Sequence, residues 1–280
     1  MEIQNEITKE VFERHVPAAK RPKDQTGIFD RLPQFFSTAY AYLLKNLLGE
    51  EKETLLGENS VLKEHCIHLV CLNAFERAVR SLDLVLTGTG FGVVSTESTA
   101  PASRARVDAL LDDVICDEYR TMETITDILI KVEGWGASSQ AQKRISVLFY
   151  RPSLMVGLSS LRMTAENWSK ARSRAVTADA LLRAEISEEY MDELLVKTRT
   201  ASLGSADIVI VEKCNYFTAD FISNYELSHG SHNHTMLRSM VEQLESSPDS
   251  YPTYRNSRLY RKRHAERFQN QKEDPTFFFM

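Results

Sequence analysis

The chain has few glycines and prolines for its length and no long apolar run. Its 280 residues include 11 Gly and 8 Pro, which leaves few natural breaks and favours long regular elements, chiefly helices. No apolar stretch approaches the roughly 18–20 residues that span a bilayer. The N-terminus also lacks a basic segment followed by an apolar one. The sequence therefore predicts no membrane span and no secretion signal, and a protein made in the cytosol.

The four cysteines include no Cys-x-x-Cys pair. Three of them lie in apolar helical patterns, and a disulfide or metal framework would need a different spacing. The sequence predicts four buried free thiols in a reducing compartment, namely Cys66, Cys71, Cys116 and Cys214.

Motifs for nucleophilic catalysis and nucleotide binding are missing as well. The chain has no Gly-x-Ser-x-Gly elbow and no Gly-Lys-Ser/Thr segment. The carboxylate pairs Asp112–Asp113 and Glu188–Glu189 lie in amphipathic patterns, where a solvated helix face is the ordinary interpretation. We therefore predict no enzymatic activity, no catalytic residue and no cofactor.

Two groups of histidine raise the question of a metal site. A structural zinc site needs four ligands, usually supplied as two anchoring pairs, and the spacing here matches no established ligand pattern. We predict no bound metal, with the first group on a partly buried helix face and the second in a polar loop. The residues concerned are His65, Cys66, His68 and Cys71, then His229, His232 and His234.

Apolar residues recur every three or four positions over most of the chain, which predicts a mainly α fold, a multi-helix bundle. The clearest pattern covers about residues 101–133, a spine helix of roughly 45 Å at 1.5 Å per residue. Thr164 and Ser187 are placed to cap helices. The segment 203–224 is ambiguous, because Ile208–Val211 also suits a strand. The remaining predicted helices are 28–49, one that begins at Asn59 or Ser60, 164–185, 187–201 and 233–246.

A glycine-rich segment interrupts this helical texture. β-prone residues flank Thr87–Gly92 on both sides. A phosphate cradle is the alternative interpretation, but the third glycine is misplaced for the dinucleotide motif and no helix follows it. We predict a short β-hairpin or extended arm at about residues 84–96. Its candidate contact residues are Gly88, Gly90, Phe91 and Gly92.

Charge is distributed unevenly along the chain. The net charge is −5, but residues 251–280 carry +4, so residues 1–250 carry −9. Residues 255–267 hold six basic residues against one acid, and Tyr251, Tyr254, Tyr260 and Phe268 lie among or beside them. This composition fits an acidic partner protein, a nucleic-acid backbone or a solvated helix face. The candidate partner-binding cations are Arg255, Arg258, Arg261, Lys262, Arg263 and Arg267.

Three consecutive phenylalanines follow the basic segment. Phe277, Phe278 and Phe279 are costly to leave in water, at roughly 1.5–3 kcal/mol for each fully buried side chain. We predict that residues 251–280 form an extended tail that leaves its own globule and docks on another chain. The cations would face acidic side chains there, and the phenylalanines would enter an apolar groove.

Three stretches of the sequence carry a family resemblance. They read FERAVRSLDLVLT from Phe75, GFGVVS from Gly90 followed by APASRARVDALL from Ala100, and YPTYRNS from Tyr251 followed by RFQNQKEDPTFFF from Arg267. Together they resemble a family of functionally uncharacterised proteins encoded by phages and prophages of gut Bacteroidetes, among virion-assembly genes. The resemblance spans nearly the whole chain, and its motifs carry no known chemistry.

The N-terminal plan is also similar to the small helical head–tail adaptors of tailed phages. Those adaptors have a few antiparallel helices, a β-prone excursion before a long helix, and a C-terminal tail that reaches into the portal. The resemblance implies a structural virion protein, a neck subunit that forms a ring, expected to be twelvefold, below the portal. Its partners would be the portal, neighbouring copies and tail or neck proteins, with DNA passing through the lumen without sequence-specific binding.

Two alternatives remain at this point. One is a tail terminator or head-completion protein, which is also a virion protein. The other is a host-directed or nucleic-acid-binding regulator that uses the basic segment 255–267. In either case the predicted organisation has three parts: a helical adaptor-like domain at 1–136, a second mostly helical region at 137–250, and the docking tail at 251–280.

Overall fold

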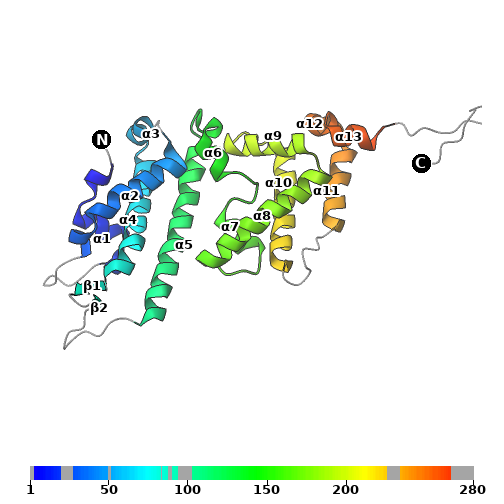
Figure 1. Ribbon diagram of the computed structural model, residues 1–280. Helices are drawn as coiled ribbons and strands as arrows, with labels where there is room; N and C mark the ends of the chain where they lie inside the picture. Colours follow the sequence, from blue (N-terminus) through cyan, green and yellow to red (C-terminus); the bar gives the residue numbers. More distant parts are fainter. Residues whose placement is uncertain are drawn as a thin grey trace, which may run out of the picture.

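The computed structural model describes residues 3–19, 28–49, 52–82, 84–87, 90–93, 103–225 and 234–265. Helices dominate these residues, so the predicted mainly α class is confirmed. Figure 1 shows an elongated arrangement in which α1–α4 lie together at the N-terminal end, the long α5 lies beside them, and α7–α11 form a second group. α12 and α13 lie at the far end of the molecule. Within the described ranges, no helix combines the length and apolar character needed to cross a bilayer.

The N-terminal group is built around aromatic side chains. The Phe12 ring lies 6.0 Å from that of Phe36 and 6.3 Å from that of Phe75, centroid to centroid. The predicted helix 28–49 is divided here, because Pro33 opens an α-helix whose last turn widens to π geometry before Gly49, at φ 71°, ends it. The elements are η1 (Ile3–Glu6), α1 (Lys9–His15), η2 (Pro17–Ala19), η3 (Ile28–Arg31), α2 (Pro33–Leu43), η4 (Leu44–Leu48), α3 (Lys52–Glu58) and α4 (Ser60–Leu82).

A short antiparallel strand pair follows α4. β1 (Leu84–Thr87) pairs with β2 (Gly90–Val93), with Leu84 opposite Val93 and Thr87 opposite Gly90. Residues 88, 89 and 94–96 of the predicted arm lie outside the described residues. The role of this segment as a contact arm stays a prediction.

The spine helix predicted at 101–133 is α5 (Arg104–Leu129), roughly 39 Å long. One face is buried and follows the helical period through Leu111, Val114, Ile125 and Leu129. The helix ends four residues earlier than predicted, because the backbone hydrogen bonds tighten there to Lys131→Ile128 and Val132→Leu129. Gly134, at φ 81° in the left-handed region, then redirects the chain into η5.

The second group contains the helices whose caps the sequence predicts. The Thr164 hydroxyl accepts from the Asn167 amide, and the Ser187 hydroxyl accepts from the Tyr190 amide. The ambiguous segment 203–224 is helical, and its buried side chains Ile210, Cys214, Phe217 and Phe221 recur every three or four residues. The elements are η5 (Trp135–Ala137), α6 (Ser139–Arg144), α7 (Pro152–Leu158), α8 (Ala165–Glu185), α9 (Glu188–Arg199), α10 (Ser205–Asn224), α11 (His234–Ser246) and η6 (Pro248–Ser250).

The turn after α5 joins the two groups. The Trp135 indole donates to the Leu47 carbonyl oxygen at 2.7 Å. A Cβ on Gly136 would lie 2.6 Å from the Arg199 carbonyl oxygen, so this close approach of two backbones requires glycine. One hydrophobic core continues across this turn from α2 and α4 to α9–α11. The domain boundary predicted after residue 136 falls within this packed turn.

The structure corrects the predicted tail over residues 251–264. α12 (Pro252–Arg255) and α13 (Arg258–Arg263) fold back on the same chain, where Tyr251 and Tyr254 are buried. Their rings lie 5.8 and 6.4 Å from that of Tyr190 in α9. The physical reason is that Tyr251 and Tyr254, three residues apart, form one apolar face of a helical turn. Residues 266–280, with Arg267 and the three phenylalanines, lie outside the described residues.

Candidate interaction site

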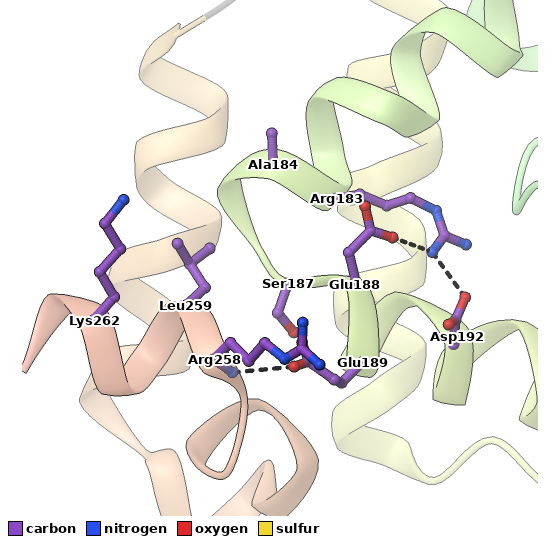
Figure 2. A pocket seen from close by; sticks show the side chains of 9 residues that line it. All are labelled: Arg183, Ala184, Ser187, Glu188, Glu189, Asp192, Arg258, Leu259 and Lys262. Atoms are coloured by element: carbon purple, nitrogen blue, oxygen red, sulfur yellow. Dashed lines mark hydrogen bonds and ion pairs between the residues drawn. The ribbon is translucent and has the colours of Figure 1, made fainter.

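A cleft of about 490 Å³ lies where α8 passes into α9 and α13 packs beside them. Figure 2 shows Leu259 and Lys262 of α13 on one side, Arg183 and Asp192 on the other, and Arg258 between them. Two of the predicted partner-binding cations, Arg258 and Lys262, therefore line a defined cleft at the surface of the protein. The lining residues are Arg183, Ala184, Ser187, Glu188, Glu189, Asp192, Arg258, Leu259 and Lys262.

Two serine residues cap the helices that line this cleft. Ser187 caps α9, and Ser257 caps α13 by accepting from the Tyr260 amide at 3.1 Å. Glu189, in the first turn of α9, accepts from the Arg258 backbone amide at 3.1 Å and so joins the two helix starts. The pKa of Glu189 is lowered first by its own backbone amide and then by that of Arg258. The carboxylate is therefore held ionised at the start of both helices, where negative charge is favoured.

Arg183 is surrounded by three carboxylates. It contacts Asp179 at 2.6 Å and both Glu188 and Asp192 at 2.7 Å. Burial alone would lower the pKa of Arg183, but the hydrogen bonds that its guanidinium donates to Glu188, Asp179 and Asp192 raise it. The charge of this guanidinium is therefore permanent and locally compensated. The positive charge available in the cleft comes from α13 instead.

The predicted cations divide into two groups. Arg255 forms an ion pair with Asp249, and Arg263 contacts both the Glu185 carboxylate at 3.2 Å and the Glu185 carbonyl oxygen at 2.8 Å. These acids belong to the same chain, which corrects the prediction that Arg255 and Arg263 face acids on another chain. The sequence could not show it, because Glu185 precedes Arg263 by 78 residues.

The other three cations of α13 remain available at the surface. Arg258, Arg261 and Lys262 are exposed, and none of their side chains forms an ion pair with a described residue. Arg261 donates only to the Ser257 carbonyl oxygen, at 3.4 Å. The cleft lining thus combines the exposed cations Arg258 and Lys262 with the apolar side chains of Ala184 and Leu259 and with exposed carboxylates, which suits a protein segment of mixed polarity.

The predicted arm is not brought to this cleft. Gly90, Phe91 and Gly92 lie in β2, at the opposite end of the molecule from α13 (Figure 1), and Gly88 lies outside the described residues. The residues that the sequence did not single out are Arg183 and Asp192. The spacing of Asp179 and Arg183, four apart on one helix, was the signal that could have found the first of them.

Histidines and cysteines form no metal centre in the described part of the chain, where no three His, Cys, Asp or Glu side chains gather as ligands. His68 stacks on His15 with ring centroids 5.2 Å apart. Residues 229–233, with two histidines of the second group, lie outside the described residues. All four cysteines are free and buried as predicted, and burial raises the pKa of Cys66 and Cys71 to about 12.

We expect replacement of Arg183 by methionine to lower the free energy of unfolding by about 2 kcal/mol, because Asp179 would remain largely buried without its partner. Urea denaturation measures the loss. Arg120→Met is the matched control, since Arg120 and Asp117 form an exposed pair worth at most about 0.5 kcal/mol. Equal losses in the two variants would show that the carboxylates around Arg183 do not depend on it.

One family matches part of the chain. Residues 32–145 match a family of unknown function, DUF6712. The matched stretch begins at the residue before α2, includes α5 and ends just after α6, so it does not include α8, α9 or α13. No curated protein and no solved structure matches the chain. The chain is therefore similar to this family over α2–α4, the spine helix and the turn that joins the two groups, but not over α1.

Proposed function

We propose that the protein is a structural subunit of a tailed-phage virion, a head–tail connector that forms a ring below the portal and joins the capsid to the tail. We expect a ring of about twelve copies, with the portal on one face, tail or neck proteins on the other, and DNA in the lumen. The three sequence motifs described above support a virion protein. The observation that best supports assembly into a ring is the separation of opposite charges on one elongated subunit.

The positive surface is α13, which has four basic residues and no acid. The negative surface is α5, where six acids that are not buried stand against three bases, while the seventh acid, Glu118, is buried. Asp113 and Asp117 are exposed on α5 and lie four residues apart, on one face of the helix. In Figure 1 α5 runs between the two helix groups, whereas α13 lies at the far end.

A ring follows from this separation. Two different surfaces on one subunit can form a head-to-tail contact, and such a contact closes into a ring when its rotation divides a full turn. Opposite charges orient the two subunits and suppress other pairings, while packed apolar groups supply most of the holding energy. α5, roughly 39 Å long, gives each subunit a rigid wall along which the neighbour can align.

The test is a charge reversal and its compensation. Arg258→Glu together with Arg261→Glu should abolish the large species that light scattering detects after size-exclusion chromatography, with or without the portal. The acidic-side reversal, Asp113→Arg with Asp117→Arg, should do the same. Mixing the two variants should restore a contact between them, because each then carries one intact and one complementary reversed surface.

Lys143→Glu is the control, since Lys143 is an exposed cation of α6 outside both surfaces. Assembly should be unchanged in this variant. A wild-type chain that remains monomeric alone and with the portal would contradict the connector. If that monomer instead shifts DNA at physiological salt through the three exposed cations of α13, the nucleic-acid-binding alternative takes its place.

A further inference from the structure

A second surface of the molecule, on α10, exposes apolar side chains. Seven large hydrophobic residues are exposed in the described part of the chain, and three of them lie on α10. Val209 and Tyr216 are seven residues apart and therefore share one face of the helix. Tyr216 is 55% exposed, which is unusual for an aromatic side chain on a helix that is otherwise well buried. The third residue is Ile208.

A groove runs beside this apolar face, between α10 and α11. Its volume is about 520 Å³, and it is lined by Lys213, Tyr216, Thr235, Met236 and Ser239. The ring of Tyr216 and the side chain of Met236 supply its apolar surface. Methionine is flexible and polarizable, and it makes favourable contacts with aromatic rings.

We propose that this groove binds the Phe277–Phe279 segment of the same chain. The first argument is the position at which the described chain stops. The His264 ring nitrogen lies 3.1 Å from the Glu245 carboxylate, so α13 ends beside the last turn of α11. Met236 lies nine residues before Glu245, which is roughly 14 Å along the helix.

The second argument is reach. Eleven residues separate Ala265 from Phe277, and extended chain spans roughly 3.3 Å per residue. The segment can therefore extend roughly 36 Å, more than twice the distance along α11. Docking on the same molecule costs little chain entropy at this length, since the effective local concentration of a short tethered segment is in the millimolar range.

The third argument is complementarity. Three adjacent phenylalanines offer apolar surface to the Tyr216 ring, which is 55% exposed at the groove. Glu273 and Asp274 precede them by a few residues, and Lys213 lies in the groove wall. Lys213 donates to the Gln243 side-chain oxygen and forms no ion pair with a described carboxylate. Its charge is therefore available to the acidic pair.

Disulfide trapping in the full chain tests the proposal. Tyr216→Cys combined with Phe278→Cys should cross-link rapidly when copper phenanthroline is added as the oxidant. The native thiols are all buried, which keeps them out of the reaction. The control pair is Val61→Cys with Phe278→Cys, because Val61 is 59% exposed on α4 in the other helix group. We expect the first pair to react at least about tenfold faster, as the local concentration requires.

Mixed samples of ¹⁴N- and ¹⁵N-labelled protein identify the source of the segment. Cross-linked peptides of a single isotope support docking within one chain. Mixed-isotope peptides as the main product would overturn the proposal in favour of docking between copies, and equal rates for the two cysteine pairs would overturn any docking at this groove. As a second measurement, Phe277→Ser with Phe278→Ser should speed hydrogen exchange in residues 235–239, whereas Lys272→Ser should not.

Discussion

Replacement of Asp207 by alanine is expected to lower the free energy of unfolding by about 2–4 kcal/mol. Asp207 is buried in the first turn of α10. One carboxylate oxygen accepts from the Tyr190 hydroxyl at 2.9 Å, and the other accepts from Lys197 at 2.8 Å and from the Gly204 amide at 3.4 Å. Alanine would leave the Tyr190 hydroxyl and the start of α10 without their acceptor, whereas Lys197 would keep its ion pair with Glu193 at 2.6 Å.

The loss should extend to the interaction surface. The ring of Tyr190, in α9, packs against the rings of Tyr251 and Tyr254. These contacts hold α12, and α13 after it, against α9. Burial, together with the hydrogen bond to Asp207, raises the pKa of Tyr190, so its hydroxyl stays protonated and donates to Asp207. Removing the acceptor should therefore loosen the α13 cleft before the rest of the chain unfolds.

Urea denaturation measures the global loss, and hydrogen exchange in residues 252–263 measures the local one. Asp249→Ala is the matched control, because the Asp249 side chain is 85% exposed and its pair with Arg255 is worth at most about 1 kcal/mol. The loss of unfolding free energy in Asp207→Asn should lie between those of Asp207→Ala and Asp249→Ala, since the amide oxygen can still accept from the Tyr190 hydroxyl. A loss at Asp207→Ala no larger than at Asp249→Ala would mean that the Tyr190 hydroxyl does not depend on Asp207 as its acceptor.

The elements that local patterns determine are those that the sequence predicts well. Thr164, Ser187 and Asn59 act as caps where the sequence places them, because a cap bonds to amides two or three residues away. The buried faces of α5 and α10 follow the helical period, which decides the ambiguous stretch Ile208–Val211 in favour of a helix.

The misjudged elements depend on contacts between distant residues. Tyr251 and Tyr254 were interpreted as aromatic residues of a docking tail, but Tyr190 lies some sixty residues earlier and buries them. Arg263 has no acid nearby in its own helix and finds Glu185 in α8. A basic, aromatic segment is compatible with both outcomes, because the same groups that bind a partner also bind the body of their own chain.

The sequence predicted the cations of the candidate site but not the opposite wall of the cleft. The exposed cations of α13 came from composition, whereas the wall formed by Arg183 and Asp192 required the turn between α8 and α9 to be known. The sharp change of direction at Ser187 brings the end of one helix to the start of the next. Periodicity locates both helices and says nothing of the angle between them.

The second large expected effect is a pH dependence of stability caused by Glu118, which lies on the face of α5 that is buried against α4. Its exposure is 6%, and one carboxylate oxygen accepts from the Asn73 side-chain amide at 3.2 Å. The other oxygen has no partner among the described residues. Burial raises the pKa of Glu118 from 4.5 to about 7, while the Asn73 hydrogen bond opposes the rise and the neighbouring Glu76 adds to it. The folded protein therefore favours the protonated acid.

The sign of the pH dependence follows from this. The unfolded chain ionises Glu118 near pH 4.5, whereas the folded chain resists ionisation up to about pH 7. The wild type should lose stability as the pH rises through this window, and the loss should level off above it. This difference in pKa between the folded and unfolded chains lowers the free energy of unfolding by about 3 kcal/mol above pH 7, at 1.36 kcal/mol for each pKa unit.

Glu118→Gln should remove that loss. The amide can keep the hydrogen bond to Asn73 and has no charge to bury, so the variant should be about 2–3 kcal/mol more stable than the wild type at pH 8 and equal to it below pH 4.5. Urea denaturation of both proteins across this range measures the difference, in which the contributions of all other groups cancel. Glu133→Gln, at an exposed position beyond the end of α5, should follow the wild type at every pH. A stability difference that stays constant with pH, or that grows toward acid, would show that Glu118 is ionised in the folded core.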